Sequence, residues 1–99
     1  MKNRILQLVV CIGLTVFPSY AASQKGMISY YSPGRASTCA HRTLRFGTIV
    51  KVEYRGKVIS CRVNDRGPFV RGRILDVSLA SAHALGMTSA GIVYATMQW

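Results

Sequence analysis

The sequence predicts a small, mainly β protein: a β-barrel with one short helix that follows an export signal. The chain has 99 residues, of which 49% are hydrophobic and 16% are charged, so it encodes one packed domain at most. Several short apolar runs are bounded by turn residues, as strands are, and one segment has residues typical of helix ends. The length excludes a multidomain enzyme, a doubly wound cofactor-binding fold and a polytopic membrane protein.

The first 21 residues are predicted to be a cleaved signal peptide. Lys2 and Arg4 form a positive start, residues 5–17 are mostly apolar, and Pro18 ends the apolar stretch before the small residues that a signal peptidase reads. A retained N-terminal anchor is the alternative, although a membrane span needs roughly 20 apolar residues. The predicted mature domain is therefore 22–99. Without Lys2 and Arg4 it keeps 11 of the 13 basic residues beside 3 acidic ones, a formal charge of +8.

Five β-strands are predicted in this domain because β-prone runs alternate with clusters of Gly, Pro, Asn and Ser. These runs are 26–31, 48–54, 58–63, 73–77 and 92–97. The second run alternates polar and apolar residues, and the turn Arg55-Gly56-Lys57 joins it to the third as a hairpin. No internal repeat or low-complexity segment interrupts the order of strands.

One short helix is predicted at residues 79–85. Ser78 precedes it as an N-cap, and Gly86 follows it where a left-handed residue is tolerated. His83 lies on this helix and is expected to be a packing or surface residue.

Cys39 and Cys61 are predicted to form a disulfide, because removal of the signal leaves only these two cysteines in an oxidising compartment. Closing a loop of this size stabilises the fold by about 3 kcal/mol in the chain-entropy model. Two cysteines and two histidines at these spacings match no zinc pattern. Neither a metal nor another cofactor is therefore expected.

Two segments are typical of a functional site rather than of a scaffold. They are Ala-His-Arg-Thr-Leu-Arg-Phe-Gly-Thr at 40–48 and Asn-Asp-Arg-Gly-Pro-Phe at 64–69. Together with Ser-Tyr-Tyr at 29–31 and Ala-Leu-Gly-Met at 84–87, they resemble the double-psi β-barrel domain of the rare lipoprotein A family, over nearly the whole of 26–99. Members of that family are septal lytic transglycosylases of the bacterial cell wall.

The resemblance implies a six-stranded double-psi β-barrel that cleaves peptidoglycan glycan strands. It further implies a preference for strands without stem peptides and products with 1,6-anhydro-muramic acid ends. The segment 32–38 is shorter than in the family and has no carboxylate, so a glutamate of the family's cleft has no counterpart, and Arg45 replaces a proline. The alternative is a non-catalytic, expansin-like module that binds the polysaccharide.

Carboxylates are scarce in the predicted domain, which has only Glu53, Asp65 and Asp76. Glycoside hydrolysis requires two carboxyl groups that face the bond, whereas in a lytic transglycosylase the substrate's own 6-hydroxyl attacks and one acid/base suffices. The composition therefore favours a lyase. Glu53 lies among basic residues beside the hairpin turn and is expected to be a solvated surface charge.

Asp65 is the candidate acid/base, because it lies in a loop directly after a strand, where scaffolds present functional groups. A turn-capping role is its alternative. His41 is the second catalytic candidate, as hydrogen-bond partner or proton shuttle of Asp65, against a structural role. Asp76 is the rival acid, although its apolar strand favours a buried carboxylate that holds a loop through backbone hydrogen bonds.

Tyr31, Arg42 and Arg66 are the candidate substrate-binding residues. Tyr31 would stack on a sugar ring, and either Tyr30 or Tyr31 must face inward if both lie on a strand. The net charge of +10 suits an anionic polymer such as peptidoglycan, and a solubility surface is the alternative explanation. Nucleic acid is not an expected partner, because the chain is exported and has no motif for it. The expected protein is a periplasmic or secreted monomer without a membrane anchor after signal cleavage.

Overall fold

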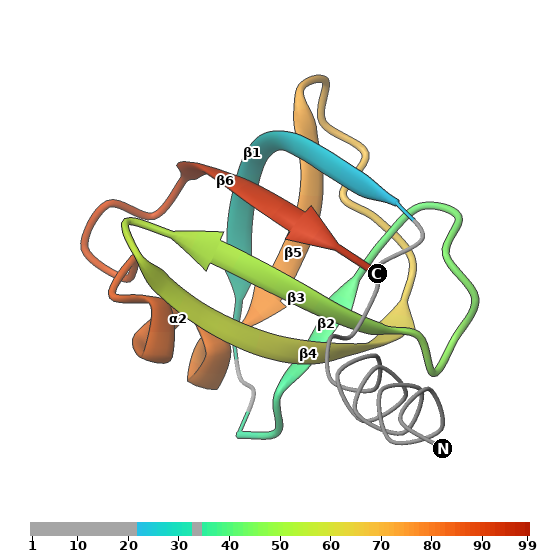
Figure 1. The fold of residues 1–99 in the computed structure, drawn as a ribbon, viewed down its shortest axis with the longest axis horizontal. Helices are drawn as coiled ribbons and strands as arrows, with labels where there is room; N and C mark the ends of the chain where they lie inside the picture. Colours follow the sequence, from blue (N-terminus) through green and yellow to red (C-terminus); the bar gives the residue numbers. More distant parts are fainter. Residues whose placement is uncertain (1–21, 33–34) are drawn as a thin grey trace, which may run out of the picture.

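The computed structural model describes residues 22–32 and 35–99, so the predicted signal peptide lies outside the described residues. The described chain closes into a barrel with the strand order β1-β5-β2-β4-β3-β6 and carries one helix, α2 (Figure 1). The strands are β1 (Ser23–Tyr31), β2 (Thr38–Ala40), β3 (Ile49–Tyr54), β4 (Lys57–Asp65), β5 (Arg73–Ser78) and β6 (Val93–Gln98), and α2 spans Leu79–Leu85. The predicted six-stranded barrel with one short helix is confirmed.

Two parallel strand pairs give the barrel its topology. β1 is parallel to β5, β2 is parallel to β4, and the antiparallel contact between β2 and β5 joins the two pairs. The remaining contacts, β1 with β6, β3 with β4 and β3 with β6, are antiparallel. Because parallel strands end at the same edge, the segments that follow β2 and β4 leave the barrel side by side, and both belong to the predicted site.

β2 is the one strand that the sequence pattern does not predict. Its three residues are too few to display a period of two, and it forms because β4 and β5 supply hydrogen-bonding partners on both sides. The predicted hairpin has a tighter turn than expected. Lys57 already pairs with Tyr54, which leaves Arg55 and Gly56 as a two-residue turn with φ angles of 51° and 80°. Positive φ at both positions matches the twist of the two strands.

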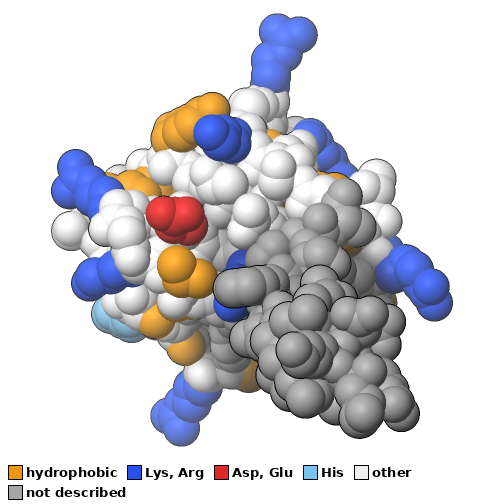
Figure 2. Space-filling view, in the orientation of Figure 1, with side chains coloured by type: hydrophobic (Ala, Val, Ile, Leu, Met, Phe, Trp, Pro, Cys, Tyr) orange, Lys and Arg blue, Asp and Glu red, His pale blue; other side chains and the backbone are white. Residues whose placement is uncertain are grey.

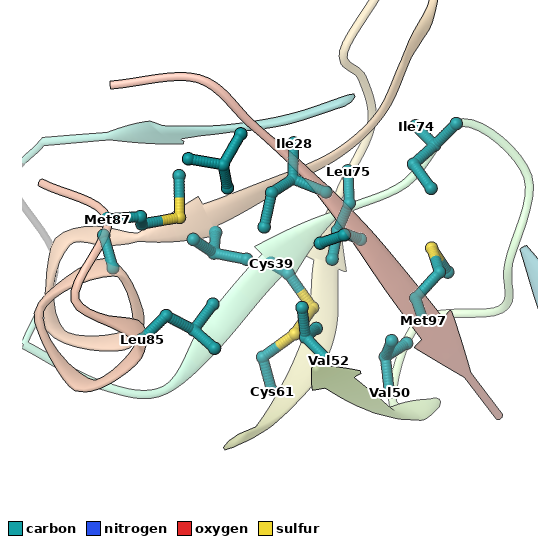
Figure 3. Packing of buried hydrophobic residues seen from close by; sticks show 14 of the residues in the cluster. Ile28, Cys39, Val50, Val52, Cys61, Ile74, Leu75, Leu85, Met87 and Met97 are labelled. Carbon is teal, nitrogen blue, oxygen red and sulfur yellow. A yellow bond between two sulfur atoms is a disulfide. The ribbon is translucent and has the colours of Figure 1, made fainter. Parts of the chain in front are cut away.

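The helix ends are as predicted. The Ser78 hydroxyl accepts a hydrogen bond from the backbone N–H of Ser81 at 3.3 Å, and Gly86 has a φ of 72°. His83 is exposed on this helix. Leu85 and Met87, at the end of α2 and just beyond it, point into the barrel (Figure 3).

The core fills the barrel, and the disulfide lies inside it. Cys39 of β2 and Cys61 of β4 are bonded, with 5.7 Å between their Cα atoms, and both are buried (Figure 3). The predicted pairing is confirmed. The bond ties β2, the shortest strand, to a long neighbour and to the apolar residues around it.

A tight backbone contact at Gly26 gives a test of the packing. A Cβ atom at this buried position of β1 would lie 2.7 Å from Cγ2 of Ile74 on β5. Overpacking of this kind costs about 1–3 kcal/mol, so Gly26→Ala should lower the free energy of unfolding by that amount in urea titrations. Lys25→Ala, at the exposed neighbouring position, is the matched control and should change stability by less than about 0.5 kcal/mol. Equal stability of the two variants would contradict this contact.

Candidate active site

A row of cross-strand partners runs across four adjacent strands of the barrel. Ser29 of β1 pairs with Asp76 of β5, Asp76 pairs with Ala40 of β2, and Ala40 pairs with Asp65 of β4. Ser29 and Ala40 are buried, Asp76 is half-buried and Asp65 is exposed. We name Ser29, Asp76, Ala40 and Asp65 the carboxylate row. Its two acidic residues are two strands apart, which places their Cα atoms at about 10 Å, with only the methyl group of Ala40 between them.

A bulge places Asp65 in this row. The register between β2 and β4 shifts beside Ala40, so that Asp65 instead of Asn64 lies opposite it. Without the bulge, the alternation of β4 would turn Asp65 to the same side as buried Val63. Asp65 is exposed, and its Oδ1 accepts a hydrogen bond from the backbone N–H of Arg66 at 2.8 Å. The carboxylate therefore caps its own turn, as the alternative interpretation predicts, while it remains open to a ligand.

Asp76 makes a different contact from the one predicted. It is half-buried, and its Oδ1 accepts a hydrogen bond from the Ser29 hydroxyl instead of holding a loop through backbone groups. The reason is that Leu75 and Val77 face the core, so strand alternation turns Asp76 to the other side of β5, next to its cross-strand partner Ser29. Its side chain consequently turns outward, onto the carboxylate row.

His41 follows β2 directly and is bound to the end of β4 through its backbone. Its N–H donates to the carbonyl oxygen of Asp65 at 3.1 Å. Its ring lies elsewhere: Nδ1 accepts hydrogen bonds from the backbone N–H groups of Thr43 and Leu44, both at 3.1 Å, and Nε2 lies 3.4 Å from Oε1 of Gln24. Within residues 22–32 and 35–99 no hydrogen bond joins the side chains of His41 and Asp65. The predicted side-chain pair is thus a backbone pair in the structure.

Arg66 fixes the turn that begins at His41. Its Nη1 donates to the carbonyl oxygens of His41 at 3.1 Å and Leu44 at 2.7 Å, and its guanidinium lies 4.3 Å from the centre of the Phe46 ring. This part of the side chain therefore faces protein groups. Arg42, by contrast, is exposed next to His41.

The two tyrosines face opposite ways, as the strand geometry requires. Tyr30 packs against the core and donates its hydroxyl to the carbonyl oxygen of Thr88 at 3.0 Å. Tyr31 lies two residues beyond Ser29 on the outer side of β1, and its hydroxyl is 2.8 Å from Oγ1 of Thr38. Tyr31 is therefore the tyrosine that a ligand on the carboxylate row can reach.

Two residues of the site carry no role in the sequence analysis. Ser29 stands in the Ser-Tyr-Tyr run that supports the family resemblance, but its partner Asp76 is 47 residues away. Gln24, the partner of the His41 ring, lies in a stretch with no motif at all. Only closure of the barrel brings these pairs together.

On one face of the molecule the basic side chains do not gather into a single patch. On the face that Figure 2 shows, Lys and Arg project at separate points around the outline. Among residues 22–32 and 35–99, no group of three His, Cys, Asp or Glu side chains is arranged to hold a metal ion. The same residues contain no helix of sufficient length and apolarity to span a membrane.

Burial lowers the pKa of His41, and the nearby charges of Arg42 and Arg66 lower it further. In the unfolded chain His41 has the ordinary histidine pKa of about 6.5. As the pH falls, His41 is therefore protonated in the unfolded chain before it is protonated in the folded chain. The stability that the folded chain gains from keeping His41 neutral is fully present above pH 6.5. It is lost as the pH falls from there through the lowered pKa of the folded chain. Urea unfolding at about pH 7.5 and 5.5 should show a smaller pH dependence for His41→Asn than for the natural chain. Identical pH dependence would contradict the shift.

Comparison with known proteins places the chain in a family. A family model described as "Lytic transglycolase" matches residues 23–97. The chain belongs to this family. The lytic transglycolase domain is 42% identical over 83 residues to the probable endolytic peptidoglycan transglycosylase RlpA of Synechocystis sp., which covers 68% of this chain and 26% of the relative. It is 36% identical over 98 residues to the endolytic peptidoglycan transglycosylase RlpA of Campylobacter jejuni, with coverage of 80% and 36%.

The predicted membership of the rare lipoprotein A family is confirmed by this match and by the RlpA relatives. The chain spans about a quarter of the length of the first relative and about a third of the length of the second. Two solved structures share the fold of the lytic transglycolase domain, each with a TM-score of 0.67. They are a Streptomyces papain inhibitor (20% identity; 80% of this chain and 94% of that chain) and the expansin of Clavibacter michiganensis (19%; 79% and 50%).

Proposed function

We propose that this domain is a lytic transglycosylase that cleaves the glycan strands of peptidoglycan on the carboxylate row. The observation that carries the proposal is the placement of Asp65 and Asp76 as the cross-strand partners on either side of Ala40. The family membership and the names of the RlpA relatives support the same reaction. The products in this proposal are fragments with 1,6-anhydro-muramic acid ends.

Asp65 is the acid/base of the proposed reaction. Protonated Asp65 donates its proton to the glycosidic oxygen as the bond from that oxygen to the anomeric carbon breaks. The muramyl 6-hydroxyl then bonds to the anomeric carbon and returns a proton to Asp65, so no water is consumed. Asp76, held by Ser29, supplies negative charge opposite the positive charge that develops at the anomeric carbon.

The binding residues proposed beside this row are Tyr31, Arg42 and Arg66. Tyr31 offers its ring to a sugar, and exposed Arg42 offers its charge to a muramyl lactyl carboxylate. Those lactyl groups are free acids only where stem peptides have been removed, which gives the preference for peptide-free strands. Arg66 contributes by holding the turn on which Arg42 lies.

The proposed setting is outside the cytoplasm, in the periplasm or the medium, after removal of residues 1–21. The buried Cys39–Cys61 bond supports an oxidising compartment. We propose that the domain 22–99 acts there as a monomer, without a membrane anchor and without a cofactor.

The second candidate is a module that binds glycan strands without cleaving them. Two observations favour it: the segment 32–38 has no carboxylate, and one oxygen of Asp65 is occupied by its own turn. The two candidates differ in whether the polymer is broken.

Mass spectrometry of the products separates the two candidates. Amidase-treated glycan strands are incubated with the oxidised domain 22–99, and binding is measured in parallel by cosedimentation with intact strands. Fragments with anhydro-muramic acid ends are the expected result. Intact strands that still retain the protein would overturn the lyase and favour the binding module. Equal cleavage of strands with stem peptides would contradict the proposed preference.

A further inference from the structure

The ring of His41 is held by contacts that depend on where its proton lies. Nδ1 lies 3.1 Å from the backbone nitrogens of both Thr43 and Leu44, and both of these nitrogens are donors. A ring nitrogen accepts a hydrogen bond only through a lone pair, so Nδ1 carries no proton in this arrangement. A neutral imidazole then has its proton on Nε2, which faces the amide oxygen of Gln24 at 3.4 Å.

The backbone around the ring is anchored at both ends of the turn. The N–H of His41 is bound to the Asp65 carbonyl, and Arg66 donates to the carbonyl oxygens of His41 and Leu44. Residues 41–44 therefore form a closed turn, with the His41 ring as the acceptor at its centre. We name this segment the His41 turn. It is joined to Asp65, the residue that presents the carboxylate, by the hydrogen bond of the His41 N–H.

From this geometry we infer that His41 is a positioning residue and not a proton carrier: as the neutral Nε2–H tautomer, it holds the His41 turn against Asp65. The inference rests on the proposed function only for its effect on catalysis. A proton on Nδ1 would face two N–H donors and would break the turn. A proton released from Nε2 would leave toward Gln24 on β1, away from the carboxylate row.

The groups that face His41 also favour the neutral ring. Gln24 comes from β1, the centre of the Trp99 ring lies 6.2 Å from that of the His41 ring, and His41 is only 7% exposed. The charged neighbours are the Arg42 and Arg66 side chains, which oppose a positive ring. Asp65 approaches through its backbone carbonyl, while its carboxylate is bound to the N–H of Arg66.

Nitrogen-detected NMR of the whole domain, with 15N-labelled histidine, tests the tautomer directly and does not depend on catalysis. Exposed His83 supplies the reference signal and is assigned with His83→Ala. For His41 we expect a protonated Nε2 and an unprotonated Nδ1 at neutral pH. A proton on Nδ1, either as the other tautomer or as the imidazolium, would overturn the inference.

Two variants of His41 separate positioning from proton transfer. In His41→Asn the amide oxygen reaches the place of Nδ1 and can accept from the turn, whereas in His41→Gln the amide reaches the place of Nε2. We expect the Thr43 and Leu44 amides to exchange with solvent about tenfold faster in His41→Gln than in His41→Asn, because the hydrogen bonds of the turn are lost. Equal exchange in both variants would overturn the positioning role.

Activity gives a separate readout. If His41 positions the turn, His41→Asn should keep a higher kcat than His41→Gln. The activity of His41→Asn should also have the same pH profile as that of the natural chain. Equal and near-complete loss in both variants, with the Thr43 and Leu44 amides still protected in His41→Asn, would indicate a proton carrier and overturn the inference. If the natural chain cleaves no glycan, the proposed function fails, while the tautomer and exchange measurements still decide the inference. If His41→Gln does not fold, the tautomer measurement on the natural chain decides it.

Discussion

Asparagine at either carboxylate of the row is expected to remove most of the proposed lyase activity. Asp65→Asn removes the proton that the leaving oxygen needs, so kcat should fall by about 10²–10⁴-fold. Asp76→Asn keeps an acceptor for the Ser29 hydroxyl but removes the negative charge, and kcat should fall by about 10²–10³-fold. Both rates are followed as the release of anhydro-ended fragments.

Glu53→Gln is the matched control for these two substitutions. It removes the third acidic side chain of the described domain, from an exposed position on β3 that pairs with Val58 and Thr96, outside the carboxylate row. Its kcat should equal that of the natural chain. Binding to intact strands should persist in all three variants. If one of the aspartate variants keeps full activity, the other residue alone is the acid/base and the assignment of two roles is wrong.

Loss of the disulfide is expected to have the largest effect on stability. Cys39 and Cys61 are separated by 22 residues, and closing a loop of that length stabilises a protein by about 3 kcal/mol in the chain-entropy model. The effect is large for this domain because so short a chain buries a modest core. The bond also joins β2, which has only three residues, to β4. Cys39→Ala combined with Cys61→Ala should lower the urea midpoint accordingly.

Reducing agent provides the control for the disulfide. It should lower the stability of the natural domain toward that of the double variant and leave the double variant unchanged. A double variant within about 0.5 kcal/mol of the oxidised domain would contradict the expected contribution. Because β2 carries Ala40 and leads into the His41 turn, we also expect glycan cleavage to decrease on reduction before the rest of the barrel unfolds.

Local signals determined much of this molecule from the sequence alone. The helix between Ser78 and Gly86 could be predicted because its caps act within a few residues of the backbone groups that they satisfy. The hairpin around Gly56 has the same local origin. The disulfide followed from the count of cysteines in a chain that the sequence predicts to be exported. Membership of the family followed from two short motifs that lie close to the site.

Closure of the barrel decided the parts that the sequence could not. β2 exists because two distant strands offer partners to three residues, and the bulge opposite Ala40 turns Asp65 outward. The carboxylate of Asp76 finds its donor, Ser29, 47 residues away. Contacts at such separations leave no periodic or capping pattern in the chain, because each depends on the register of strands that meet only in the folded state. The sequence thus named most residues of the candidate site, and the tertiary structure added Ser29 and Gln24 and assigned the partners of each.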